Sequence, residues 1–170
     1  MISPWVRLVA NTVAKSPDGP GEVYHAFAQS DYVAVLARTP SGQIPIVRQF
    51  RAAVGCETWE LPAGLLETGE SPESCCRREL LEETGITAKT VHPLGSFFAD
   101  TGRLENRIHL FAVEASEPQP TSVPEPGLSV VFVSPSELRQ RILDGTFIHQ
   151  LHLGTLAVAA LKGHGFGVLS

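Results

Sequence analysis

One acidic segment constrains this chain more than any other stretch. Glu79, Glu82 and Glu83 stand three and four residues apart, a spacing that places them on one face of a helix. Like charges at this spacing repel one another and weaken a helix. We therefore expect a positive partner beside them. Because Mg²⁺ and Mn²⁺ prefer oxygen ligands, a divalent cation is the simplest candidate.

The residues that flank the acidic cluster predict where this helix begins and ends. Ser71 suits the N-cap, and Pro72 suits the first helical position, where its missing N–H costs nothing. Gly85 is typical of the left-handed residue that stops a helix. We expect Cys75 and Cys76 to be small buried helix residues. The apolar stripe that would pack the helix onto a sheet consists of Cys76, Leu80 and Leu81.

The spacing of residues around the helix resembles the Nudix box. Gly64 is followed after five residues by Glu70, and after seven more by residues 78–86 (RELLEETGI), so every fixed position of the box is filled. The resemblance implies an α+β fold, a Nudix-type α/β/α sandwich with a mixed central sheet, here with an N-terminal β extension. It also implies Mg²⁺ as the cofactor, with Mn²⁺ able to substitute.

The resemblance also implies roles for individual residues of the box. Glu79 and Glu83 would be the principal metal ligands, with Glu82 as a third, directly or through water. The backbone carbonyl of Ala63 would join them. Arg78 would orient the helix by pairing with a carboxylate, and its candidate partners are Glu70 and Glu79.

Residues before the box resemble the sugar-nucleotide, ADP-ribose pyrophosphatase-like branch of the family. Two segments carry this resemblance, residues 47–51 (VRQFR) and 59–64 (WELPAG). We expect Arg51 to contact the diphosphate of a substrate, because a planar guanidinium suits phosphate oxygens. Arg48 is the alternative, and one of the two is then a surface charge. Glu60 matches a position near the substrate or the metals, although a short strand also exposes charges that have no role.

Relatives in this branch carry a catalytic glutamate on a loop well beyond the box. The matching segment here is residues 99–107 (ADTGRLENR), which departs from the usual serine-, proline- and glycine-rich pattern. Glu105 is the candidate general base or extra metal ligand, and Asp100 is second. The alternative is that Glu105 is an ordinary carboxylate at a loop end. The catalytic set implied by the resemblance is Glu105, Glu82 and Arg78.

The implied reaction is metal-dependent hydrolysis of the pyrophosphate bond in a nucleoside diphosphate linked to another moiety. ADP-ribose or a related sugar nucleotide is favoured and would give two monophosphates, such as AMP and ribose 5-phosphate. GDP-mannose, NADH and dinucleoside polyphosphates are alternatives within the family. A non-catalytic Nudix-fold nucleotide sensor is an alternative from another class, which the intact glutamates disfavour.

Composition limits the partners and the compartment. The chain of 170 residues has the length of one domain, and its net charge of −5 argues against nucleic acid as a partner. Three cysteines, two of them adjacent, do not make a disulfide framework, so we expect a reducing, cytoplasmic setting. The sequence predicts no membrane segment. His149 and His152 could serve a metal, but near a helix start we expect partly exposed side chains.

Periodicity and turn residues give the order of elements. Strands are expected at residues 5–13, 22–29, 59–61, 87–98, 106–113 and 128–133, and a β-hairpin at residues 32–50 around a turn at 40–42. The prolines of residues 114–127 exclude regular structure. Ser134 opens a capping box for a helix that stops near Asp144. A last helix, residues 148–162, carries an apolar set: Leu153, Leu156, Ala157, Ala160 and Leu161.

The resemblance also implies two units. We expect residues 1–35 to form an N-terminal β extension and residues 36–170 to form the Nudix hydrolase domain. The extension resembles the strands that ADP-ribose pyrophosphatase-like members often exchange within a homodimer, so a homodimer is expected. The alternative is that these strands extend the sheet of their own subunit.

Overall fold

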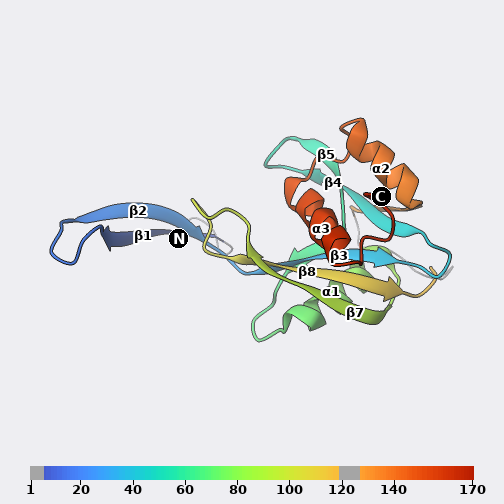
Figure 1. Ribbon diagram of the computed structural model, residues 1–170, viewed down its shortest axis with the longest axis horizontal. Coiled ribbons are helices and arrows are strands. Elements are labelled where there is room, and N and C mark those ends of the chain that lie inside the picture. Colours follow the sequence, from blue (N-terminus) through green and yellow to red (C-terminus); the bar gives the residue numbers. More distant parts are fainter. Residues whose placement is uncertain (1–5, 119–126) are drawn as a thin grey trace.

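A mixed sheet in the order β6-β3-β8-β7 forms the centre of the molecule (Figure 1). The computed structural model describes residues 6–118 and 127–170. β3 and β8 run parallel, and the other two pairings are antiparallel. The strands of this sheet are β3 (Tyr32–Arg38), β6 (Ala63–Leu65), β7 (Ala88–Phe98) and β8 (Arg107–Ala115).

A second, antiparallel sheet has the order β5-β4-β9, and the helices complete the body. Its strands are β4 (Ile44–Arg51), β5 (Cys56–Glu60) and β9 (Ser129–Val133). The described helices are α1 (Pro72–Thr84), α2 (Pro135–Leu143) and α3 (Gln150–Leu161).

Alternation along β3 explains why helices cover both faces of the central sheet. Successive side chains of a strand point to opposite faces. Val33 and Val35 belong to the apolar cluster that includes Cys76 and Leu80 of α1. Ala34 and Leu36 belong to the cluster that includes Leu156 of α3. The expected α+β sandwich with a mixed central sheet is therefore confirmed.

The predicted limits of α1 and α2 are confirmed by their caps, whereas α3 begins two residues later than predicted. The hydroxyl of Ser71 accepts a hydrogen bond from the Ser74 N–H at 3.1 Å, and Gly85 has a left-handed φ of 71°. Ser134 and Glu137 form both hydrogen bonds of the capping box. Among the residues that the structure describes, no helix is long and apolar enough to span a membrane.

The predicted β-hairpin at residues 32–50 is wrong in its pairing, although both strands exist. The turn forms, with the Thr39 N–H donating to the Gln43 carbonyl at 2.8 Å. Beyond it, however, β3 pairs with β6 and β8, whereas β4 pairs with β5 and β9. A tight turn reverses the chain but does not decide which edges pair. β3 is apolar on both faces and lies between two strands of the central sheet.

The apolar stripes expected on the helices are only partly correct. α1 buries Cys75, Cys76 and Leu80, but Leu81 is 48% exposed. In α3, Leu156 is buried as expected, whereas Leu161 is 88% exposed. Ala157 and Ala160 are also exposed, and Leu153 is half-buried. The buried face of α1 differs from the predicted apolar stripe because it also includes Glu79 and Glu83, which a pattern of apolar residues does not mark.

An N-terminal hairpin extends away from the body (Figure 1). Its strands, β1 (Arg7–Ala14) and β2 (Gly21–Ala28), pair along their full length. Trp5 and residues 119–126 lie outside the described residues. β3 spans the expected unit boundary at residue 35, and the hairpin itself ends at Ala28. Several large apolar side chains of the hairpin are exposed: Leu8, Val13, Val23, Tyr24 and Phe27.

Replacing Leu36 by alanine tests the position of the core. Leu36 is fully buried between the central sheet and α3, so we expect Leu36→Ala to lower the free energy of unfolding by about 2–5 kcal/mol. Leu161→Ala removes the same atoms from an exposed site and should change it by less than about 0.5 kcal/mol. Urea denaturation followed by circular dichroism measures both, and equal effects would contradict this core.

Candidate active site

The carboxylate of Glu79 packs directly against the backbone of Gly64. A Cβ atom built on Gly64 would lie 1.9 Å from that carboxylate, so no other residue fits there. Glu79 is 8% exposed and Glu83 is 6% exposed. Buried carboxylates are stable only where a charge or hydrogen bonds compensate them. Glu79 and Glu83 are therefore buried beside β6 and do not belong to a solvated helix surface.

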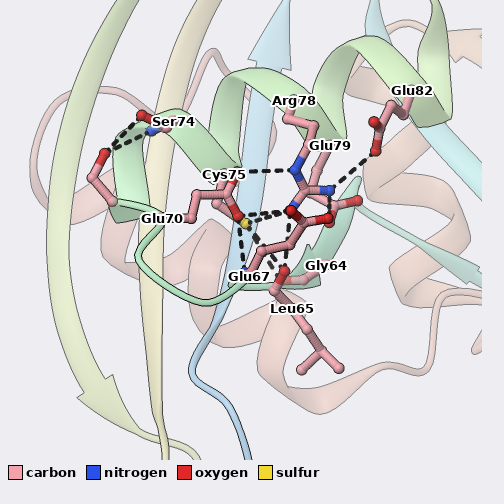
Figure 2. Close-up of polar contacts among 10 residues, drawn as sticks. Gly64, Leu65, Glu67, Glu70, Ser74, Cys75, Arg78, Glu79 and Glu82 are labelled. Carbon is pink, nitrogen blue, oxygen red and sulfur yellow. Dashed lines mark hydrogen bonds and ion pairs between the residues drawn. The ribbon is translucent and has the colours of Figure 1, made fainter.

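Arg78 joins the acidic helix to the loop before it (Figure 2). Its Nε and Nη2 atoms donate to the two carboxylate oxygens of Glu70 at 2.9 and 2.8 Å. Nη1 donates to Glu79 at 2.7 Å and to Glu82 at 3.0 Å. Nη2 also donates to the carbonyl of Leu65 at 3.1 Å. Both pairings expected from the sequence are present, and Glu82 is an additional partner.

These contacts shift the pKa values of Glu70 and Arg78 in the directions that keep both side chains charged. The hydrogen bonds from Arg78 lower the pKa of Glu70 to about 2. The same pair, followed by Glu79 and Glu82, raises the pKa of Arg78 above its ordinary value, although partial burial opposes this. The guanidinium thus remains a fixed positive charge beside three carboxylates.

Glu83 reaches the same loop from one turn further along α1. Its Oε2 atom accepts a hydrogen bond from the Ala63 N–H at 2.9 Å. The group formed by Glu79, Glu82, Glu83 and the nearby Ala63 peptide offers oxygen ligands, which are the donors that Mg²⁺ and Mn²⁺ prefer. These residues therefore fit a hard divalent cation. Beside Glu79 opens a cavity of about 660 Å³, lined by Ser30, Leu65, Leu66, Glu67, Thr68, Arg78 and Glu79.

Arg51 and Glu60 form a bidentate ion pair at a second cavity. Arg51 donates from Nε at 2.8 Å and from Nη2 at 2.5 Å, and the Thr58 hydroxyl donates to the same carboxylate at 2.5 Å. Burial of the fully enclosed Glu60 favours its neutral form, but these hydrogen bonds outweigh burial and lower its pKa. The hydrogen bonds to Glu60 raise the pKa of Arg51, and the charge of Glu83 adds to this effect. Arg51 is thus within electrostatic reach of the acidic helix.

The structure separates the two arginines that the sequence left as alternatives. Arg51 lines a cavity of about 350 Å³ together with Ala53, Val54, Thr58, Glu60 and residues 148–151. Arg48 pairs with the exposed Glu57 at the surface and lies over the ring of Trp59. Arg51 therefore lies where a ligand could reach it, and Arg48 makes a surface ion pair.

The expectation that both histidines are partly exposed is wrong for His152. Its side chain is 1% exposed and its ring stacks on that of His149, with centroids 3.9 Å apart. Burial lowers the pKa of His152 to about 3. Its Nδ1 atom accepts a hydrogen bond from the Leu61 N–H at 3.0 Å. The sequence held a signal for this burial, because residues 152, 156 and 159 share one face of a helix.

Glu60, His149 and His152 also bring three potential metal-binding atoms within 4.8 Å of one another. The surrounding contacts favour another arrangement. Arg51 already donates to both oxygens of Glu60. Because Nδ1 of His152 accepts from a backbone N–H, the proton of the neutral ring resides on Nε2, which then has no lone pair to offer. The three side chains therefore suit a buried polar network better than a metal.

The carboxylate of Glu105 lies beside the N-terminal hairpin. Its Oε1 atom accepts a hydrogen bond from Asn11 Nδ2 at 2.9 Å, and its N–H donates to the Phe27 carbonyl at 3.1 Å. Asn11 pairs with Tyr24, which lies three residues further from the body than Phe27. The side chain of Glu105 therefore points along the hairpin. Asp100 accepts from the Gly102 N–H at 2.8 Å within its own loop.

Comparison with known proteins places the chain in a family. A family model described as "NUDIX domain" matches residues 29–151, so this chain belongs to the Nudix domain family. An ADP-ribose pyrophosphatase of Bacillus subtilis (strain 168) is 40% identical over 98 residues, covering 58% of this chain and 53% of that protein. One from Mycobacterium tuberculosis is 32% identical over 135 residues, covering 76% of this chain and 65% of that protein.

A third relative carries a different substrate in its name. A GDP-mannose pyrophosphatase of Klebsiella pneumoniae is 34% identical over 116 residues, covering 60% of this chain and 56% of that protein. The chain thus spans between about half and two thirds of the length of these three relatives. The family assignment confirms the predicted resemblance to Nudix proteins.

Removing the charge of Glu70 tests the Arg78 network through its pH dependence. Because the folded-state pKa is near 2 and the ordinary value is 4.5, the pair stabilises fully above pH 4.5 and its contribution is lost as the pH falls towards 2. We expect Glu70→Gln to lower the free energy of unfolding by about 1–3 kcal/mol at pH 7. The difference from wild type should shrink below pH 4.5. Denaturant titrations at several pH values measure it, with the exposed Glu67→Gln as control.

Proposed function

We propose that the protein catalyses Mg²⁺-dependent hydrolysis of the pyrophosphate bond in a nucleoside diphosphate linked to another moiety. ADP-ribose or a related sugar nucleotide is the favoured substrate, giving two monophosphates such as AMP and ribose 5-phosphate. The observation that carries the proposal is the pair of buried carboxylates, Glu79 and Glu83, packed against Ala63 and Gly64 of β6. The names of the ADP-ribose pyrophosphatase relatives support this substrate class.

Within this proposal, Glu79, Glu83, Glu82 and the Ala63 carbonyl hold the cation. A bound divalent cation would neutralise charge on the diphosphate and favour attack by water. The ion pairs of Arg78 hold two of these carboxylates in place, so we assign it an orienting role. Glu82 differs from the other two because its side chain is 52% exposed. That exposure suits a ligand that completes the site from the solvent side.

Arg51 is the proposed contact for the substrate diphosphate. Its side chain is 43% exposed at the second cavity, while Glu60 holds its Nε and Nη2 atoms. Nη1 can donate to an anion, and the carboxylate of Glu60 fixes the plane of the guanidinium. Glu60 therefore supports substrate binding through Arg51. GDP-mannose is a second candidate substrate, favoured by the relative from Klebsiella pneumoniae.

Glu105 is proposed as the general base, which requires its carboxylate to leave Asn11 when substrate binds. We expect Glu105→Gln to lower kcat about 100-fold or more with little change in KM, because a glutamine cannot accept the proton of the attacking water. Steady-state kinetics with ADP-ribose measure the effect. A near-wild-type kcat would exclude Glu105 as the base, and Asp100→Asn would then be compared.

A panel of substrates tests the activity itself. The panel consists of ADP-ribose, GDP-mannose, NADH and diadenosine polyphosphates, each incubated with and without Mg²⁺. Products of pyrophosphate hydrolysis should form only with Mg²⁺ present, and ADP-ribose should give AMP and ribose 5-phosphate. Glu83→Gln should lower kcat by at least about 100-fold, because it removes a charged ligand from the proposed site. Glu73→Gln, the same change at an exposed position of the same helix, should retain activity. If the protein binds compounds of the panel but hydrolyses none of them, the result would instead support a non-catalytic nucleotide sensor.

The N-terminal extension is the proposed dimerisation element, and a cytoplasmic homodimer is part of the proposal. A two-stranded ribbon is marginally stable by itself, and this one exposes five large apolar side chains. The free state of Cys56, Cys75 and Cys76 supports a reducing compartment. Light scattering of the full chain and of Tyr24→Asp tests the dimer. A monomeric wild type at micromolar concentration would exclude it.

A further inference from the structure

The loop that leads into the acidic helix is held from two sides of the central sheet. On one side, Glu83 of α1 accepts the Ala63 N–H at 2.9 Å. On the other side, His152 of α3 accepts the Leu61 N–H at 3.0 Å. Between them, the Pro62 carbonyl accepts the Val35 N–H of β3 at 2.9 Å. Three elements far apart in sequence thus converge on three consecutive residues, Leu61, Pro62 and Ala63.

Pro62 limits the number of backbone N–H groups that can hold this segment in place. Pro62 has no N–H and a fixed φ, so the segment offers only the N–H groups of Leu61 and Ala63. Leu61 and Pro62 are buried, and a buried backbone N–H without a partner is costly. His152 is the partner that the fold supplies for Leu61. Removing it leaves that peptide free to rotate towards another acceptor.

The ring of His152 is itself held in one orientation. It is almost fully buried in the first turn of α3, and His149 covers one of its faces at a centroid separation of 3.9 Å. The two rings are within 15° of parallel. Nδ1 is therefore presented to Leu61 from a rigid helix, which is what a supporting contact requires.

We infer that His152 is a positioning residue of the metal site. By accepting the Leu61 N–H, it sets the peptide planes of the loop and thereby the direction of the Ala63 carbonyl relative to Glu79 and Glu83. A backbone carbonyl has no side-chain rotamer that could adjust, so the direction in which it points depends on the contacts of the neighbouring residues. The inference rests on the proposed metal site, and it gives α3 a part in metal binding.

Two variants that differ only in where they place an acceptor test this role. In His152→Asn, the carbonyl oxygen is bonded to Cγ as Nδ1 is, so it reproduces the acceptor. In His152→Gln, the oxygen is one bond further from the backbone and misses that position. We expect the Mn²⁺ dissociation constant of the substrate-free protein to rise about 10-fold or more for Gln and to stay within about threefold for Asn.

The control and the readout separate positioning from stability. Thr155→Val removes a buried hydroxyl from the same helix, where that hydroxyl donates to the Leu151 carbonyl one turn earlier in α3 at 3.0 Å. It should lower the melting temperature and leave Mn²⁺ affinity unchanged. Electron paramagnetic resonance of Mn²⁺ and thermal melts of the metal-free protein give the two quantities independently of turnover.

These measurements distinguish failure of the positioning role of His152 from failure of the proposed function. Equal Mn²⁺ affinity of the Asn, Gln and wild-type proteins would overturn the positioning role, whatever their melting temperatures. Equal losses in the Asn and Gln variants would overturn it as well, because the placement of the acceptor would then be irrelevant. If wild type binds Mn²⁺ but hydrolyses no substrate of the panel, the proposed activity fails and the role of His152 stands.

Discussion

The site depends on one guanidinium that lies among three carboxylates. Arg78 contacts Glu70, Glu79 and Glu82 and also the carbonyl of Leu65, so it joins the acidic helix to the loop before it. Without this charge, the spacing of the acids would oppose the helix that carries them. With it, Glu79 can pack against Gly64 and remain buried. One ion-pair network therefore stabilises both the helix and the placement of the acids that we propose as metal ligands.

The two faces of the central sheet serve the site differently. α1 brings the acids to the loop at residues 61–64, and α3 brings a neutral, buried imidazole to the same loop from the opposite face. Alternating side chains along β3 attach both helices to one strand, and Val35 of that strand also contacts the loop. The sandwich thus allows side chains from both faces of the sheet to hold one short segment.

Under the proposed function, an acidic protein would receive an acidic substrate through positive charges that are local and held in place. With a net charge of −5, the surface as a whole does not attract a diphosphate. Arg51 is fixed by a fully buried glutamate at a cavity within reach of the charge of Glu83. A divalent cation at the acidic helix would add charge on the other side. On the hairpin side, Asn11 holds Glu105, so the N-terminal extension contacts the loop that bears the proposed base.

The sequence by itself determined the features that act over a few residues. Caps at Ser71 and Gly85, the capping box at Ser134 and the order of strands and helices follow from short-range sterics and hydrogen bonding. The spacing of the Nudix box identified the fold class and the family. Tertiary structure alone decided that β3 and β4 enter different sheets, that Leu81 faces solvent and that Arg51 has Glu60 as its partner. It also decided that His152 is buried against Leu61 and that Glu105 meets Asn11, contacts that span 91 and 94 residues. Local patterns carry no information about such partners, because these contacts form only when the sheet and its two helical faces assemble.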